Sequence, residues 1–256
     1  MGYISGVRVR YACRKIFPIL LKYSDYWDVG LEEGLWEFSS GVYANYQLGS
    51  GTTQWDKMSA DDIDNDFISA ELGIGDSSEE IVLDFMWLGT WGISKESTSE
   101  TWYKLTDDDP YDMRAVKFVG SPDYEILVRF NSVNGLWMWN TSGTFPGYWT
   151  KLTNDNPTAD EAFCEPFDPD GLYEATGDEE VAIDFGAKGL WLYNWTGGTK
   201  WTKLTNDSPQ FMVRSDLNGD GMDTILICDF GLLGLWYYAG TTGTWHRLTG
   251  DSPDNL

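Results

Sequence analysis

One short segment of the chain carries oxygen-bearing side chains at closely spaced positions. Residues 216–223 read DLNGDGMD, in which Asp216, Asn218, Asp220 and Asp223 are interspersed with glycines. Calcium binds six to eight hard oxygen atoms, and a loop that supplies them must turn sharply, which glycine allows. The spacing therefore predicts a structural calcium (Ca2+) site at these four side chains. The alternative is a polar hairpin whose Asp and Asn side chains bond their own backbone.

Residues for other chemistry are few. His246 is the only histidine, so a histidine-rich metal centre is excluded and a Ser-His-Asp triad would depend on this one residue. Acids recur in similar sequence contexts at Asp28, Asp84, Asp184 and Asp229, and glycoside hydrolysis uses a pair of carboxyl groups. Since a catalytic pair should depart from a repeat, we expect these aspartates to accept backbone N–H groups at strand ends. The sequence therefore predicts a protein that is not an enzyme.

The charge balance limits the partners. The chain has 17 Lys and Arg against 41 Asp and Glu, a formal net charge of -24. Such a field repels nucleic acid and anionic lipid, which leaves neutral or cationic ligands and divalent cations. No apolar run approaches the roughly 20 residues of a membrane span. We expect no nucleic-acid partner and no membrane insertion.

The acidic segment belongs to the last of five similar units. A segment of the type W-x-K-L-T recurs 44 to 52 residues apart, at Trp55, Trp102, Trp149, Trp201 and Trp245. A GLW or GTW signature precedes each copy, with its tryptophan at Trp36, Trp91, Trp137, Trp191 and Trp236. The predicted units are residues 1–60, 61–108, 109–155, 156–207 and 208–256.

Within a unit, the residue pattern is that of short strands. ILICDF and VAIDF are β-branched runs typical of strands buried on both faces, whereas TWHRLT alternates as a half-exposed outer strand does. Gly-rich turns between such runs predict four antiparallel strands per unit. Five units of this kind predict a single-domain, all-β, five-bladed β-propeller. In a closed ring, the last unit leads to an N-terminal strand around residues 7–13.

These patterns are similar to those of two families. DLNGDGMD followed by a β run resembles the FG-GAP and VCBS type of propeller repeat, in which such a loop binds calcium. Five Trp- and Gly-rich units of this length resemble the tachylectin-like sugar-binding propellers. The resemblance implies a calcium-supported propeller that binds carbohydrate.

Repetition also favours multivalent binding, because several weak equivalent sites give avidity beyond single-site affinity. Each outer-strand tryptophan shares a face of its strand with a cation, which suits a cation–π contact or a pocket between blades. The ligand-binding candidates are Trp55, Trp102, Trp149, Trp201, Trp245, Lys104, Lys151, Lys203 and Arg247. The tryptophans of the GLW signature are expected in the core between blades.

Three cysteines, Cys13, Cys164 and Cys228, stand at unrelated spacings. An odd number without a pattern predicts neither a metal site nor a full disulfide framework. We expect small buried side chains at these positions.

Taken together, the residues favour a lectin-like protein that binds glycans or glycoproteins outside the cell or at the cell surface. A scaffold or adhesion module that uses the same blades for protein contact is the first alternative. A glycoside hydrolase that acts through carboxylates in a central funnel is the second.

Overall fold

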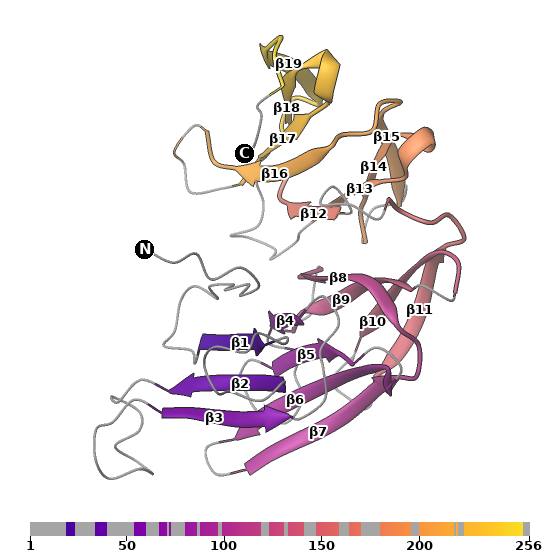
Figure 1. Cartoon of the computed structure of the whole chain (residues 1–256). Coiled ribbons are helices and arrows are strands. Elements are labelled where there is room, and N and C mark those ends of the chain that lie inside the picture. Colours follow the sequence, from indigo (N-terminus) through magenta and orange to yellow (C-terminus); the bar gives the residue numbers. More distant parts are fainter. Residues whose placement is uncertain are drawn as a thin grey trace.

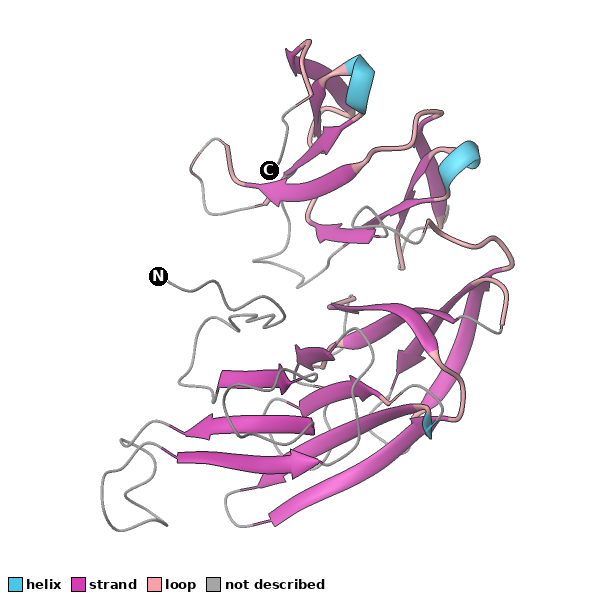
Figure 2. Cartoon of the chain, in the orientation of Figure 1, coloured by secondary structure: helices cyan, strands magenta, loops and turns pink. Residues whose placement is uncertain are grey.

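The chain is a β protein. The computed structural model describes residues 19–23, 34–39, 54–59, 67–70, 72, 80–85, 88–96, 99–118, 123–130, 133–140, 147–158, 164–169, 180–195, 200–217, 219 and 223–252. Strands dominate these residues, and two short 3-10 helices, η3 (Gly186–Lys188) and η4 (Gly231–Leu233), interrupt them (Figure 2). None of the helices in the described part is long and apolar enough to cross a membrane.

The strands pair into five antiparallel sheets, in which each strand pairs with its neighbours in the chain (Figure 1). Sheet A contains β1 (Ile19–Tyr23), β2 (Gly34–Ser39) and β3 (Gln54–Ser59). Sheet B contains β4 (Phe67–Ala70), β5 (Glu80–Asp84), β6 (Thr90–Glu96) and β7 (Ser99–Thr106). Sheet C contains β8 (Pro110–Val116), β9 (Glu125–Phe130), β10 (Leu136–Asn140) and β11 (Tyr148–Thr153). Sheet D contains β12 (Cys164–Phe167), β13 (Glu180–Asp184), β14 (Leu190–Tyr193) and β15 (Trp201–Thr205). Sheet E contains β16 (Phe211–Ser215), β17 (Ile225–Asp229), β18 (Leu235–Ala239) and β19 (Thr244–Thr249).

Burial follows the position of a strand within its sheet. The second strand β13 is buried at every residue, and β9 is buried at all but one. The fourth strands β11 and β19 have no buried residue. This gradient matches the sequence, in which the second strands are apolar runs and the fourth strands carry Lys, Arg and Thr.

Neighbouring sheets pack face to face through shared apolar clusters. Val82 of sheet B and Val128 of sheet C belong to one cluster, and Leu127 of sheet C and Ile183 of sheet D belong to the next. Ala182 of sheet D and Leu226 of sheet E belong to a third. Sheets C and D therefore bury both of their faces against neighbouring sheets, and the five sheets follow one another along an arc (Figure 1).

A glycine before the third strand sets the turn in sheets B to E. Gly89, Gly135, Gly189 and Gly234 have φ angles of 81° to 104°, a region that other residues rarely adopt. A Cβ atom at these positions would lie 2.1 to 2.3 Å from the carbonyl oxygen of a threonine at the end of the fourth strand. Two constraints therefore require glycine at this position of the GLW or GTW signature: the positive φ angle and the lack of space for a Cβ atom.

The all-β class with antiparallel sheets is confirmed, and each sheet lies inside one of the five predicted units. Sheets B to E have four strands, as expected, whereas the described part of sheet A has three. None of the described strands joins sheet E to sheet A, and residues 7–13 lie outside the described residues.

The first unit differs from its predicted alignment. The strand that pairs with β2 is β1, in which Leu21 faces Trp36 and Lys22 faces Leu35. In sheet B, Leu83 faces Trp91 in the same way as Leu21 faces Trp36, and the next residue, Asp84, faces Thr90. Lys22, and not Asp28, therefore occupies the position of Asp84, and the placement of Asp28 in the aspartate series is wrong. Asp28 itself lies outside the described residues.

Candidate functional site: an aromatic cavity between two sheets

Three aromatic rings gather in each of sheets B to E. One is a phenylalanine at the end of the second strand or directly after it, one is the GLW or GTW tryptophan, and one is the outer-strand tryptophan. The sets are Phe85, Trp91 and Trp102; Phe130, Trp137 and Trp149; Phe185, Trp191 and Trp201; and Phe230, Trp236 and Trp245. The phenylalanine lies 5.1 to 5.9 Å from the outer tryptophan between ring centroids, a normal distance for interacting aromatic rings.

The tryptophan of each GLW or GTW signature is held in a fixed orientation. Its indole Nε1 donates to the carbonyl oxygen three residues earlier at 2.9 to 3.4 Å, in all four sheets. A cation of the fourth strand lies 5.1 to 5.8 Å from the ring centroid, and the four pairs are Lys104 with Trp91, Lys151 with Trp137, Lys203 with Trp191 and Arg247 with Trp236. The predicted cations therefore form cation–π contacts, and their partner is the ring on the neighbouring strand.

Two outer-strand tryptophans bond to the preceding sheet. Trp149 Nε1 donates to the carbonyl oxygen of Leu105 at 3.0 Å, and Trp245 Nε1 donates to that of Leu204 at 3.2 Å. Both rings are half-buried. Their polar edges are used to join sheets, so only the rest of each ring is open to a ligand.

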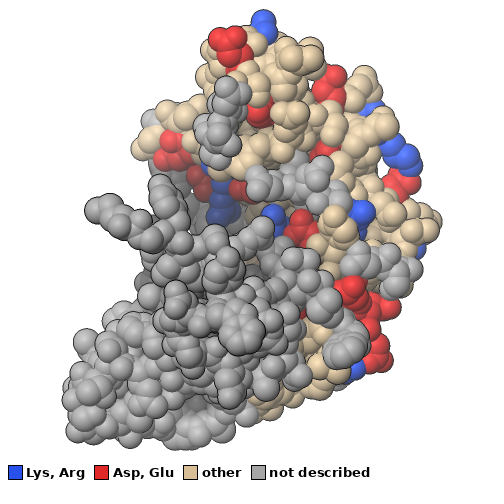
Figure 3. Space-filling model, in the orientation of Figure 1, with Lys and Arg blue, Asp and Glu red and all other residues tan. Residues whose placement is uncertain are grey.

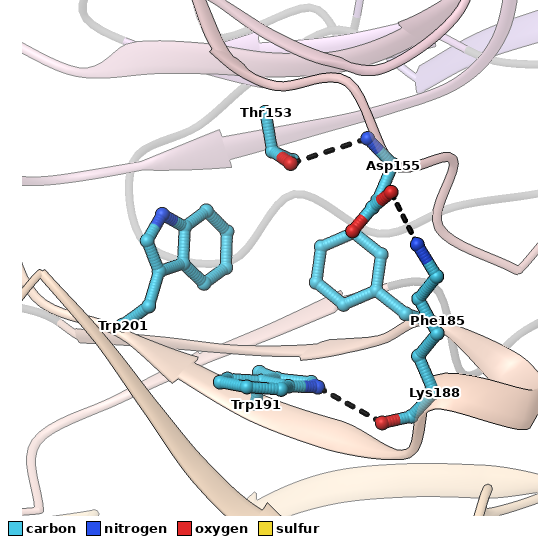
Figure 4. A pocket seen from close by; sticks show the side chains of 6 residues that line it. All are labelled: Thr153, Asp155, Phe185, Lys188, Trp191 and Trp201. Atoms are coloured by element: carbon cyan, nitrogen blue, oxygen red, sulfur yellow. Dashed lines mark hydrogen bonds and ion pairs between the residues drawn. The ribbon is translucent and has the colours of Figure 1, made fainter.

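A cavity of about 200 Å³ lies between sheets C and D (Figure 4). Its lining residues are Thr153, Asp155, Phe185, Lys188, Trp191 and Trp201. In Figure 4, the ring of Trp191 lies flat along one side of the space, with Trp201 and Phe185 on the other. The ammonium of Lys188 contacts the carboxylate of Asp155, so a cation and an anion from different sheets meet at the cavity.

The cavity is smaller than the roughly 300 to 1,000 Å³ of a site for a drug-sized ligand. It therefore suits a ligand with a single ring. Aromatic faces offer apolar contact to such a ring, while Thr153, Asp155 and Lys188 offer hydrogen-bond donors and acceptors.

Of the nine predicted ligand-binding residues, Trp201 lines this cavity. Lys203 contacts its neighbour Trp191, and Trp102 packs against Phe85. The side chain of Trp55 lies outside the described residues, although its backbone belongs to β3.

The prediction missed the phenylalanines, the polar cavity residues Thr153, Asp155 and Lys188, and the role of the GLW tryptophans. A signal was present, because a phenylalanine ends or follows the second strand in four units, and T-x-D begins at the last residue of four outer strands. In those four T-x-D turns, the Asp backbone N–H donates to the threonine hydroxyl at 3.0 to 3.2 Å.

Two aspartates of the recurring series have the predicted structural role. Asp184 accepts from the backbone N–H of Gly186 at 3.1 Å and from the hydroxyl of Ser208 at 2.7 Å. Asp229 repeats this arrangement with Gly231 at 2.9 Å and Ser252 at 2.7 Å. Both carboxylates are buried and stabilise the turn at the strand end.

The acidic loop is described in part. Asp216 accepts from the backbone N–H of Gly219 at 2.7 Å, and the carboxylate of Asp223 lies 3.3 Å from Arg214 Nε. Asn218 and Asp220 lie outside the described residues. Within the described ranges, no group of three His, Cys, Asp or Glu side chains is placed to hold a metal. The two described carboxylates thus have protein partners with which calcium would compete, and calcium at this loop stays a prediction.

Buried ionisable groups lie in the apolar cluster between sheets C and D and in the one between sheets D and E. Tyr193 packs against Trp201 with 4.6 Å between ring centroids, and burial raises the pKa of Tyr193 to about 12. Burial also raises the pKa of the Cys164 and Cys228 thiols well above the usual value. Both cysteines are buried and free, as predicted, and Cys13 lies outside the described residues.

On the face shown in Figure 3, Asp and Glu side chains gather in several groups, with Lys and Arg side chains among them. The chain matches no protein-family model, and it matches no curated protein.

Proposed function

We propose that the chain is a five-bladed β-propeller that binds carbohydrate in pockets between its blades. The five sheets support the fold, because each is a meander of consecutive strands and sheets B to E stack through their faces in chain order. The strand count of four in sheets B to E is that of a propeller blade.

The cavity between sheets C and D carries the functional proposal. A sugar ring has an apolar face formed by its C–H groups and a rim of hydroxyl groups. The indole of Trp191 suits the face, and Thr153 and Asp155 suit the hydroxyls.

The same aromatic set in sheets B to E supports several related sites. The residue before the turn glycine differs between sheets: Leu88, Asn134, Lys188 and Leu233. The repeat therefore keeps the three aromatic rings of each sheet and varies the residue before the turn glycine. Related pockets with different rims give avidity for a ligand that repeats along a chain.

The alternatives draw less support. A glycoside hydrolase needs a pair of carboxyl groups free to act, and Asp184 and Asp229 accept hydrogen bonds from serine and glycine of the protein itself. A scaffold that binds protein would use a wider apolar surface than a single-ring cavity. Calcium at the acidic loop belongs to the proposal as a structural support of sheet E.

A glycan array tests the proposal, with wild type beside Trp191→Ala and Asp155→Asn. We expect both substitutions to weaken binding, Trp191→Ala by roughly 10- to 100-fold from a stacking contact of about 1 to 3 kcal/mol. Lys200→Gln is the control, since Lys200 is exposed, lies directly before β15, contacts Trp195 and does not line the cavity.

Thermal melting of each variant separates lost binding from lost folding. Wild type that binds no glycan at any density removes the proposal. Release of reducing sugar from labelled oligosaccharides would replace it with the hydrolase alternative.

A further inference from the structure

One position of the repeat carries the opposite charge in sheet C. The second strand ends in Asp84, Asp184 and Asp229 in sheets B, D and E, each directly before a phenylalanine, and the residue before the phenylalanine in sheet C is Arg129, the last but one of β9. The serine that bonds this aspartate in sheets D and E is replaced in sheet C by Asn156. The amide oxygen of Asn156 accepts from the backbone N–H of Gly135 instead. The exchange therefore affects both partners of the aspartate–serine pair.

Arg129 is half-buried and has no carboxylate partner among the described residues. Its Nη1 is buried and has no hydrogen-bond partner, and Arg129 takes part in none of the ion pairs between described residues. The carboxylate of Asp112, on the facing residue of β8, bonds Arg114 at 3.1 Å. An unsatisfied buried donor needs an explanation, and a bound water or anion is the usual one.

An aromatic ring supports the guanidinium. The guanidinium carbon of Arg129 lies 4.4 Å from the ring centroid of Tyr111, which is itself 46% exposed. The strand pairing shifts register between Pro110 and Asp112, so Tyr111 is the extra residue of a β-bulge. Bulges redirect a side chain, and this one holds a planar cation in a fixed orientation beside solvent.

Arg129 lies along the same edge of sheet C as the cavity. Arg129 faces Leu136 in the strand pairing, and Leu136 faces Thr153, which lines the cavity. Directly facing residues share one face of a sheet, and Leu136 packs in the cluster between sheets C and D. Two steps between strands amount to about 10 Å, roughly the span of two linked sugar rings.

We propose that the junction between sheets C and D binds an acidic saccharide, whose carboxylate pairs with Arg129 while a neighbouring ring occupies the cavity. This inference rests on the proposed function, because it names the class of sugar for one of the proposed pockets. The corresponding position at the next junction is Asp184, which repels the same carboxylate. The B–C junction has Asp84 at that place. The C–D junction is thus the one suited to anions among those described.

A carboxylate fits this position better than a phosphate. The planar N–H groups of a guanidinium match the oxygens of a carboxylate or of a phosphate, so the charge of the ligand decides between them. One cation balances one negative charge, and the adjacent Asp112 and Asp155 disfavour a dianion. The net charge of -24 opposes any anionic ligand from a distance, but salt near 0.15 M screens charges beyond about 8 Å. The short-range contact therefore decides the preference at that ionic strength.

Paired ligands test the inference: uronic-acid oligosaccharides and the neutral counterparts made by reducing their carboxyl groups. Affinities are measured near 0.15 M salt for wild type, Arg129→Gln and Lys200→Gln. The two variants have the same net charge and each loses one cation–π contact, to Tyr111 or to Trp195, so they differ in whether the proposed carboxylate partner is lost. We expect wild type and Lys200→Gln to prefer the acidic member, and Arg129→Gln to lose a preference of roughly 10- to 100-fold.

The outcomes separate the two proposals. Binding of neutral oligosaccharides without preference for the acidic ones overturns the inference and leaves the proposed function in place. The same holds if the preference survives in Arg129→Gln while that variant melts like wild type. Stronger binding of sulfated or phosphorylated counterparts overturns the carboxylate assignment. Absence of all saccharide binding overturns the proposed function and the inference with it.

Discussion

The indole Nε1 of Trp149 donates a hydrogen bond to the carbonyl oxygen of Leu105 at 3.0 Å, and the two residues lie in the outer strands of neighbouring sheets. Trp245 and Leu204 repeat this bond at 3.2 Å, one sheet apart again. The outer strands are the most exposed of each sheet, so they have little apolar packing with which to hold their neighbours. A bond from ring to backbone at this place joins the edges of adjacent sheets.

Trp149→Phe keeps an aromatic ring and removes the N–H group. We expect it to lower the free energy of unfolding by about 1 kcal/mol, because the bond is lost and the Leu105 carbonyl is left without it. For a chain of this length, that corresponds to a decrease in Tm of about 2 to 4 °C. Urea denaturation and thermal melting measure the change.

Trp137→Phe is the control for Trp149→Phe, because the Nε1 of Trp137 donates to Asn134 within its own turn, on the exposed side. Loss of the Trp137 N–H group should lower the free energy of unfolding by less than loss of the Trp149 N–H group. Equal stability of Trp149→Phe and wild type would show that the bond between sheets contributes nothing.

A second prediction concerns the buried aspartates. Ser252→Ala removes the hydroxyl that donates to Asp229 at 2.7 Å and leaves a buried carboxylate with one donor fewer. We expect a loss of about 1.5 to 3 kcal/mol, the range for hydrogen bonds to charged groups. Urea denaturation measures it, and Ser208→Ala in sheet D should give a loss of similar size, because Ser208 bonds Asp184 in the same way. A loss below about 0.5 kcal/mol in both variants contradicts the structural role of this pair.

The two aspartates could be predicted from sequence, because a residue repeated in several units must serve the unit itself. The arrangement of the aromatic side chains around the cavity could not be predicted from sequence. Alternation along β15 correctly places Trp201 and Lys203 on one face, but the ring opposite Lys203 depends on pairing with β14. That pairing contains a register shift between Leu190 and Trp191, and each of the other four sheets shifts at the same place. A single strand contains no information on its cross-strand partner.

The third prediction concerns alkaline pH. Burial raises the pKa of the Cys164 and Cys228 thiols, and raises that of Tyr193 to about 12. Unfolding exposes these groups, and an exposed thiol ionises near pH 8.5 and a tyrosine near pH 10. Because the folded pKa values are the higher ones, the stability contribution is complete below the unfolded pKa values and is lost as pH rises from these toward the folded pKa values.

We therefore expect the free energy of unfolding to fall above about pH 8.5, by at most about 1.4 kcal/mol per pH unit for each thiol. Urea denaturation between pH 7 and 11 measures this slope. Cys228→Ala should be less stable at neutral pH but should show a shallower slope above pH 8.5. Tyr193→Phe should change the slope only above about pH 10. A slope that is unchanged in both variants would place its cause in other groups.

The fourth prediction concerns calcium at residues 216–223. A ligand that binds only the folded state stabilises it by about 2.7 kcal/mol at a concentration one hundred times Kd. At about 2 to 4 °C per kcal/mol, calcium should raise Tm by roughly 5 to 10 °C, and a chelator should reverse the shift. Asp216→Asn and Asp220→Asn should remove the shift, whereas Asp207→Asn, an exposed aspartate at the end of β15, should keep it. Equal melting with calcium and with chelator would remove the calcium site.

Arg214 provides the sharper test of the same loop. Its Nε lies 3.3 Å from the carboxylate of Asp223, so calcium at Asp223 must displace this contact and approach a fixed positive charge. Arg214→Gln removes the charge and frees the carboxylate, and should increase calcium affinity by roughly 5- to 10-fold, from an exposed ion pair of up to about 1 kcal/mol and the relief of repulsion. Titration calorimetry measures the affinity. If Arg214→Gln binds calcium no more tightly than wild type while Asp216→Asn still abolishes binding, calcium binds at this loop without Asp223.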